Sequence, residues 1–178
     1  MRVPGSPPRR LRTLAIAAAA LLTAVVSLAS PAAAASDTFA IHNNYAQGRC
    51  IAISGGFAVD LTCSSRADDQ IWHWGAPNAD GWQQLINNNG QCLAVQNGST
   101  AYGASIKAGT CYGPSNPDQY WGYLSDPAEP LYIANYKASF DPSHDGLWVI
   151  CVKDGSTANG AALRLGPATG NPDQFWHF

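Results

Sequence analysis

The sequence is poor in charge: Asp, Glu, Lys and Arg make up 12% of its 178 residues, and Glu129 is the only glutamate. It has a single methionine, and beyond its N-terminal region it has no apolar run long enough to span a membrane. The catalytic signatures G-x-S-x-G and H-E-x-x-H and the phosphate-binding loop are absent. No C-x-x-C pair occurs and the four histidines are scattered, which disfavours zinc. These absences predict no cofactor, no metal and no membrane insertion.

The N-terminal region has the pattern of a secretory signal peptide. Four arginines (Arg2, Arg9, Arg10 and Arg12) precede an apolar run at about 14–28, and small residues follow at 32–35. This order of charge, apolar run and small residues predicts a signal peptide over residues 1–35, cleaved near Ala35/Ser36. The alternative is a membrane anchor, but the run is interrupted and shorter than a comfortable membrane span. A twin-arginine export route is disfavoured because Arg12 stands where that signal needs an apolar residue.

The remaining residues, 36–178, suit one domain with a hydrophobic core. Without the four N-terminal arginines, six Lys and Arg stand against twelve Asp and Glu, a net charge of −6. Nucleic acids and anionic membranes both need a basic surface, so this charge argues against either as a partner. We therefore expect a secreted, extracellular monomer.

All five cysteines lie in this part of the chain, and in a secreted protein disulfides are the usual state. Sequence neighbours pair most simply, which predicts the bonds Cys50–Cys63 and Cys92–Cys111. Loops of this length stabilise a fold by roughly 3 kcal/mol each. Cys151 is left over, either as a buried free thiol or as a thiol that links two chains.

Three related segments fill residues 36–178. The strings "ADDQIWHW" (67–74), "NPDQYWGY" (116–123) and "NPDQFWHF" (171–178) share the pattern Asp-Gln-x-Trp-x-aromatic. Upstream, "NGSTAYGASIK" and "DGSTANGAALR" align without a gap. The chain therefore contains three copies of one unit, at about 39–74, 85–123 and 131–178.

The local patterns within each copy are those of β-strands. Short runs such as "CLAV", "LYIANY" and "IWHW" are rich in branched and aromatic residues and are bounded by Gly, Asn, Asp, Ser and Thr. Beyond the N-terminal region no stretch has a convincing helical period. About four strands in each copy predict an all-β fold of about twelve short strands, closed into a barrel that hides the sheet edges.

These three units, each with a C-[LI]-A-[VI]-like segment, a G-S-T-x-x-G-A turn and a terminal Q-x-W, resemble the ricin-type β-trefoil lectin domain. The resemblance implies a β-trefoil, with a barrel and a hairpin cap, and a non-catalytic carbohydrate-binding function. The implied partners are glycans or polysaccharide, recognised at shallow sites on the repeats.

The Q-x-W motif has a structural explanation that needs no ligand. Residues two apart in a strand face the same way, so each Gln and Trp should project together into the fold. We expect Trp72, Trp121 and Trp176 to be core anchors. The amides of Gln70, Gln119 and Gln174 should satisfy backbone groups of the adjoining turns.

The resemblance also implies where sugars would bind, and the sequence departs from that pattern. The family places an aspartate two residues after the first Cys, where this chain has Ala52, Ala94 and, counting from Cys151, Lys153 followed by Asp154. An aromatic residue is replaced by Leu61, Gly109 and Gly166. An Asn before the Q-x-W glutamine is replaced by Asp69, Asp118 and Asp173. The usual galactose-type site is therefore incomplete.

The remaining polar and aromatic residues at these places are the candidate carbohydrate ligands. They are Asp60 and Asp69 in copy one, Tyr102, Lys107 and Asp118 in copy two, and Lys153, Asp154, Asn159, Arg164 and Asp173 in copy three. For each of them a solvated loop position is the simpler interpretation, and the repeated aspartates could cap turns. The third copy also has an extra loop at 136–146, with His144, Asp145 and Trp148 in or beside it.

Two other functions fit the same fold. A protein-interaction module, such as a protease inhibitor, would use the long loop and the altered sugar positions. A glycosidase would need two carboxylates about the scissile bond, for which Asp60 and Asp69 are candidates, but the three repeats leave no room for a catalytic domain.

Overall fold

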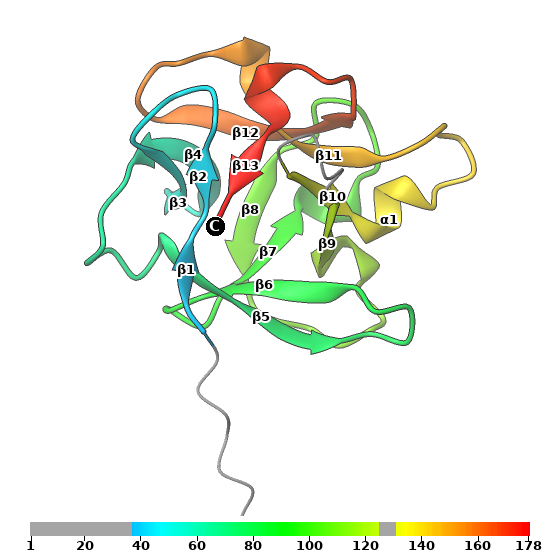
Figure 1. Ribbon diagram of the computed structural model, residues 1–178. Helices are drawn as coiled ribbons and strands as arrows, with labels where there is room; N and C mark the ends of the chain where they lie inside the picture. Colours follow the sequence, from blue (N-terminus) through cyan, green and yellow to red (C-terminus); the bar gives the residue numbers. More distant parts are fainter. Residues whose placement is uncertain (1–36, 125–130) are drawn as a thin grey trace, which may run out of the picture. The chain divides into compact units, whose positions relative to one another are not determined.

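The computed structural model describes residues 37–124 and 131–178, so the predicted signal peptide lies outside the described residues. In these two described ranges, thirteen strands follow one another in three sets (Figure 1). The first set is β1 (Phe39–Ala40), β2 (His42–Asn43), β3 (Arg49–Ser54), β4 (Phe57–Thr62) and β5 (Ile71–Pro77). The second is β6 (Gln83–Asn87), β7 (Cys92–Val95), β8 (Ile106–Gly109) and β9 (Tyr120–Leu124). The third is β10 (Tyr132–Asn135), β11 (Trp148–Val152), β12 (Ala161–Pro167) and β13 (Trp176–His177).

The first strand of the first set is split in two, which accounts for thirteen strands where the sequence predicts about twelve. The chain changes partners at the buried Ile41. β1, before it, pairs with β5, whereas β2, after it, pairs with β13 and β3. Each set therefore has four strand positions, and the predicted all-β class is confirmed.

Six strand positions form a closed barrel. β1 pairs with β5, β5 with β6, β6 with β9, and β9 with β10, all antiparallel. A bridge between Leu131 and Trp176 joins the start of β10 to β13, and β13 pairs with β2. The ring thus returns to its first strand, so its backbone groups are paired around the whole circuit.

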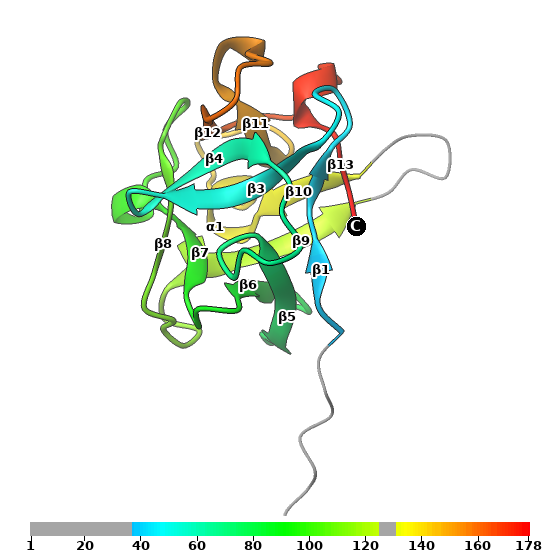
Figure 2. The same cartoon turned by 90° about the vertical axis from the view of Figure 1, so that its left-hand side faces the viewer.

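Three β-hairpins cap one end of this barrel: β3–β4, β7–β8 and β11–β12 (Figure 2). The hairpins also pair with one another, β12 with β4 and β4 with β8, and Ser105 and Arg164 bridge β8 to β12. A six-stranded barrel with three hairpins is the β-trefoil arrangement, as the sequence predicts.

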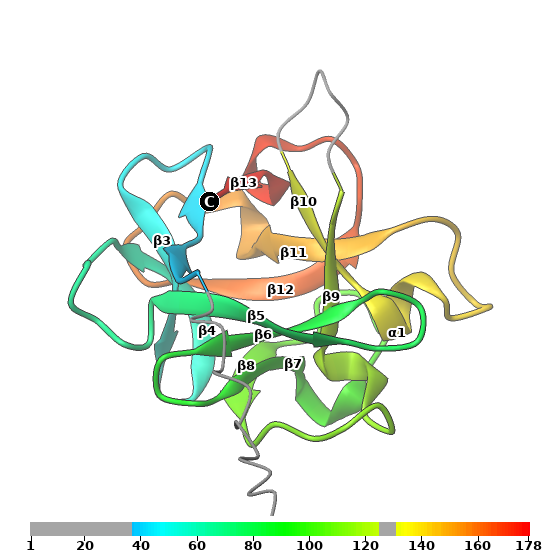
Figure 3. The same ribbon diagram turned by 60° about the horizontal axis from the view of Figure 1, so that its bottom comes forward.

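Short helical turns separate some of the strands. The described part of the chain has four 3-10 turns: η1 (Gln96–Gly98), η2 (Pro117–Gln119), η3 (Lys153–Gly155) and η4 (Pro172–Gln174). A one-turn helix, α1 (Tyr136–Ser139), packs beside β9 and η2 (Figure 3). It is too short to show a helical period in the sequence. Within the described residues, no helix has the length and apolarity needed to cross a membrane.

The three Q-x-W tryptophans lie at the centre of the core with no exposed surface, as predicted. Each indole Nε1 donates a hydrogen bond to a backbone carbonyl of the neighbouring hairpin: Trp72 to Ile51 at 3.1 Å, Trp121 to Leu93 at 2.9 Å and Trp176 to Ile150 at 3.2 Å. The tryptophans therefore fix the hairpins to the barrel as well as filling it.

The three Q-x-W glutamines are also buried, and they hold the turn that precedes each motif. In each case Oε1 accepts from a backbone N–H and Nε2 donates to a backbone carbonyl two residues earlier: Gln70 with Ser64 and Thr62, Gln119 with Tyr112 and Thr110, and Gln174 with Thr169 and Pro167. The prediction that they satisfy backbone groups is confirmed. One detail differs, because none of the glutamines lies on a strand: Gln119 and Gln174 are on 3-10 turns, and Gln70 is in the turn before β5.

Candidate functional site

The hydrogen bonds of the tryptophans fix the register of the three hairpins. Because they bond Ile51, Leu93 and Ile150 in the same way, these three positions are equivalent. The next residues, Ala52, Ala94 and Cys151, are then equivalent too. The sequence-based assignment of Lys153 to the family aspartate position is therefore wrong by two residues, and Cys151 occupies that position.

The same register explains why Cys151 has no partner. The two predicted disulfides, Cys50–Cys63 and Cys92–Cys111, are both present. Their equivalents in the third repeat are Val149 and Ala168. Ala168 N donates to the carbonyl of Leu147 at 2.8 Å, as Cys63 N donates to that of Gly48 at 3.0 Å. Cys151 is thus a free thiol in the hairpin face, not the remnant of a third disulfide.

A pocket of about 490 Å³ lies on the third repeat, over this face. Its lining comes from β11, η3, β12 and η4 and includes Cys151, Lys153, Asp154, Arg164, Asn171 and Asp173. Tyr102 and Gly103, from the second repeat, complete it. The pocket therefore brings together four sequence candidates of copy three and one of copy two.

Tyr102 belongs to this pocket and not to the site of its own repeat. The turn that carries it lies against β12, because Gly103 N donates to the carbonyl of Leu165 at 2.9 Å. A Cβ atom on Gly166 would lie 3.5 Å from Cε2 of Tyr102 and 3.2 Å from Sγ of Cys151. Only a residue without a side chain leaves this approach open. Tyr102 is nevertheless 78% exposed, so much of its ring faces solvent.

Two titratable groups lie in the pocket wall. Burial raises the pKa of the Asp173 carboxyl, although its carboxylate accepts a backbone hydrogen bond from Val152. Burial also raises the pKa of Cys151 to about 11, and its thiol donates to the carbonyl of Arg164 at 3.2 Å. Cys151 is therefore a protonated, weakly polar group at neutral pH and a poor nucleophile.

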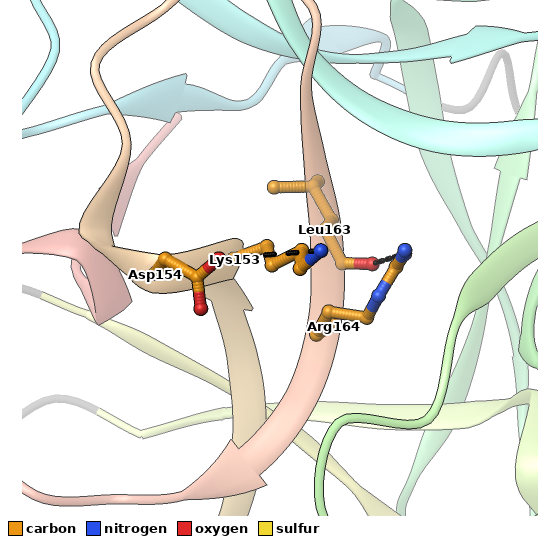
Figure 4. A network of polar contacts seen from close by, with 4 residues as sticks. All are labelled: Lys153, Asp154, Leu163 and Arg164. Carbon is orange, nitrogen blue, oxygen red and sulfur yellow. Dashed lines mark hydrogen bonds and ion pairs between the residues drawn. The ribbon is translucent and has the colours of Figure 1, made fainter.

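Charged side chains of both signs line the same pocket (Figure 4). Lys153 on η3 lies 4.0 Å from the carboxylate of Asp154, and both side chains are largely exposed. Arg164 on β12 donates from one guanidinium nitrogen to the carbonyl of Leu163 at 2.9 Å. Since a guanidinium carries five N–H donors, most of its hydrogen-bonding capacity is available to a ligand.

The second repeat has an equivalent but smaller pocket of about 340 Å³, lined among others by Ala94, Lys107, Asp118 and Lys137. Lys137 reaches it from α1 and donates to the carbonyl of Gly98. Its Nζ and an Asp118 oxygen would lie 3.0 and 3.6 Å from a Cβ atom on Gly98. The side chain of Lys137 thus fills part of this pocket.

The first-repeat candidates are committed to the fold. Asp60 has no exposed surface, so it cannot contact a ligand. One of its oxygens accepts from Asn43 Nδ2 at 3.2 Å, and the other has no partner among the described residues. Burial raises its pKa to about 6. Asp69 accepts from the backbone N of Ile53 on β3, 16 residues earlier in the chain, at 3.1 Å. The catalytic pair imagined for a glycosidase is therefore not formed.

Asn159 lies at the seam between the third and first repeats, away from the pocket of copy three. Its Oδ1 accepts from the backbone N and the hydroxyl of Thr62 at 2.8 and 3.1 Å. Because Asn159 is equivalent to Tyr102, each of these turns reaches over the next repeat. Sequence comparison alone groups each turn with its own repeat, which explains the two misplacements.

The extra loop at 136–146 is tied to the domain. His144 stacks on Trp148 with ring centroids 3.8 Å apart. Asp141 accepts from the Thr100 hydroxyl at 2.6 Å, and hydrogen bonds from Ser143 and Thr100 lower its pKa. Asp145 is exposed and lines neither the third-repeat nor the second-repeat pocket. Phe140, at 65% exposure, is the large apolar side chain that the loop offers to solvent.

Two further clusters lie outside these pockets, one of aromatic side chains and one of histidine and cysteine. The aromatic residues two positions after each Q-x-W tryptophan meet at the open end of the barrel, where Trp74, Tyr123 and Phe178 form a shallow hollow with Phe39. His42, Cys50 and Cys63 are the three metal-capable groups found together. Both cysteines are in a disulfide, so they cannot ligate a metal while it is intact.

No family model matches the sequence, and no curated protein matches it either. Solved structures with the same fold are nevertheless similar to it. The designed threefold-symmetric protein ThreeFoil has a TM-score of 0.67 at 18% identity, covering 79% of this chain and 96% of its own. The Macrolepiota procera ricin B-like lectin in complex with lactose has a TM-score of 0.61 at 19% identity, covering 80% and 94%.

Larger proteins contain the fold as a part. In the exo-β-1,3-galactanase of Clostridium thermocellum the TM-score is 0.64 at 16% identity, and the match covers 81% of this chain but only 30% of the enzyme. The chain thus spans less than a third of that protein. At these identities the similarity establishes the β-trefoil fold, and the ligand has to be argued from the pocket.

Proposed function

We propose that this protein is a secreted, non-catalytic carbohydrate-binding protein whose principal site is the pocket of the third repeat. The observation that carries the proposal is the combination of an exposed aromatic ring with hydrogen-bonding groups in one pocket. Tyr102 supplies the ring, and Asp173, Asn171 and Arg164 supply the acceptors and donors.

This combination suits the chemistry of a sugar. A pyranose has an apolar face of C–H groups that stacks on an aromatic ring, and a rim of hydroxyls that needs both donors and acceptors. A carboxylate such as Asp173 accepts from hydroxyls in charge-assisted hydrogen bonds. A pocket of about 490 Å³ has room for one or two sugar units at the end of a chain. The lactose-bound lectin of the same fold supports carbohydrate as the ligand class.

The three repeats are not expected to bind equally. The second-repeat pocket is partly filled by Lys137, and the first repeat places Ala52, Val59 and Leu61 where a polar site would be. Recognition should therefore depend mainly on the third repeat. Any avidity would come from that site together with a weaker second one.

Several features support the non-catalytic and secreted parts of the proposal. Asp60 is buried, and Asp69 is held by a backbone group. Asp154 and Asp173 lie on one pocket, but the side chain of Asp154 is largely exposed and its carboxylate lies beside Lys153. The two disulfides fit an oxidising compartment. The enzymes that share this fold contain it as a minor part of their length.

A glycan array and pulldown on insoluble polysaccharides test the proposal directly. The wild-type protein should bind at least one class of glycan. Tyr102→Ala should weaken that binding by about tenfold, since stacking of a sugar on an aromatic ring is worth roughly 1 kcal/mol or more. Tyr45→Ala is the matched control, because Tyr45 is also an exposed aromatic but lies outside the pocket. A folded wild-type protein that binds no glycan would refute the proposal.

A further inference from the structure

We infer that the third-repeat pocket takes an anionic glycan, whose carboxylate or sulfate is read by Arg164 and Lys153. The inference rests on the proposed carbohydrate-binding function and adds the charge class of the ligand. Its basis is the placement of cations on an acidic domain.

The cationic side chains of the described residues are few and unevenly distributed. Six are present, and four of them line the two threefold-equivalent pockets: Lys153 and Arg164 in the third repeat, Lys107 and Lys137 in the second. The other two are Arg49 and Arg66. Three described acids line the same pockets (Asp118, Asp154 and Asp173), whereas seven lie elsewhere. The third-repeat pocket therefore has as many cations as acids, and the second-repeat pocket has one cation more, on a surface that is otherwise acidic.

This placement follows from one pair of strand positions. Cys151 pairs across the hairpin with Arg164, and Ala94 pairs with Lys107, so each cation stands beside a small residue on the same face. The small residue occupies the position where the lectin resemblance implies a carboxylate. At this position both pockets thus lack the acid and have a cation directly across the hairpin, although Asp118, Asp154 and Asp173 remain elsewhere in their lining. The first repeat has Val59 opposite Ala52.

Such an exchange reverses the preferred partner of the site. A carboxylate at this position would accept from neutral hydroxyls and would repel an acidic sugar. A guanidinium has no acceptor, and its planar fork matches a carboxylate or sulfate. Arg164 uses one nitrogen on the Leu163 carbonyl, which orients the group and leaves donors for the ligand. Lys153 adds a mobile charge at the rim, where it is more than half exposed.

Paired probes separate this inference from the proposed function. Isothermal titration would compare oligogalacturonate with its methyl ester, and a sulfated carrageenan oligosaccharide with its desulfated form. We expect the anionic member of at least one pair to bind about tenfold more tightly than its neutral partner. The two pairs distinguish a carboxylate from a sulfate as the group that is read. The preference should weaken as salt is raised, because partly exposed charges are screened.

Variants assign the preference to the pocket. Arg164→Gln should remove most of the difference between the members of the pair, with unchanged thermal stability as the check on folding. Arg66→Gln removes the same charge outside both pockets and should leave the preference intact. Equal affinity for anionic and neutral members, or a glycan array with only neutral ligands, would overturn the inference and leave the proposed function standing. Absence of binding to all glycans would overturn both.

Discussion

A third disulfide should form if cysteines are placed at Val149 and Ala168. These residues stand where Cys92 and Cys111 stand in the second repeat, with the same separation of 19 residues along the chain. The backbone bond from Ala168 to Leu147 repeats the bond from Cys63 to Gly48. The double variant Val149→Cys/Ala168→Cys therefore needs little movement of the backbone.

Closing a loop of this length constrains the unfolded chain by about 3 kcal/mol. For a domain of this size the gain corresponds to an increase of about 10 °C in the melting temperature. Mass spectrometry after alkylation without reductant should find one free thiol, Cys151, as in the wild type, and calorimetry should show the higher melting temperature. Formation of a bond between Cys151 and either new cysteine, or two unpaired new thiols, would refute the register on which the site assignment depends.

Three further outcomes are expected. Replacement Asp60→Asn should flatten the pH dependence of stability. Because burial raises the folded-state pKa of Asp60 from 3.8 to about 6, its contribution to wild-type stability is greatest below pH 3.8 and falls by about 3 kcal/mol as pH rises through 6. Urea denaturation at several pH values would measure this fall. Replacement Trp72→Ala should cost about 3–5 kcal/mol of unfolding free energy in the same assay, and no loss would contradict its core position. The substitution Gly166→Ala should reduce glycan affinity with little effect on the fold, since the added methyl group meets Cys151 and Tyr102 in the pocket. Unchanged affinity in a titration would contradict the placement of Gly166 beneath the bound glycan.

Much of the fold could be predicted because its signals are local. The Q-x-W strings mark the end of each repeat, and the Gly-rich turns mark the strands between them. The cysteine spacings gave both disulfides. The split of the first strand at Ile41 carries no such signal, since it arises from a change of partner between β5 and β13.

The site was less predictable because it is built across repeats. Tyr102, from the second repeat, lines the pocket of the third, and Lys137, from the third repeat, lines the pocket of the second. The position of a residue within its own repeat does not predict either contact. The burial of Asp60 follows from its equivalence to Ala108 and Leu165, core positions that only the strand register reveals. The unpaired state of Cys151, in contrast, could have been predicted from the sequence. Extending the gapless alignment of the two Gly-Ser-Thr segments upstream places Cys92 opposite Val149, so Cys151 has no counterpart among the paired cysteines.

The central claim, that glycan binds in the third-repeat pocket, can be tested with the protein's own thiol. Cys151 is the one cysteine outside a disulfide and lines the pocket, so its reaction with a methanethiosulfonate reagent at about pH 9, where a small fraction of the thiol is ionised, reports on access to the site. A glycan that binds should slow the labelling in proportion to its occupancy, and a non-binding sugar should not. Saturating glycan that leaves the labelling rate of Cys151 unchanged would contradict the account and place the binding site elsewhere on the domain.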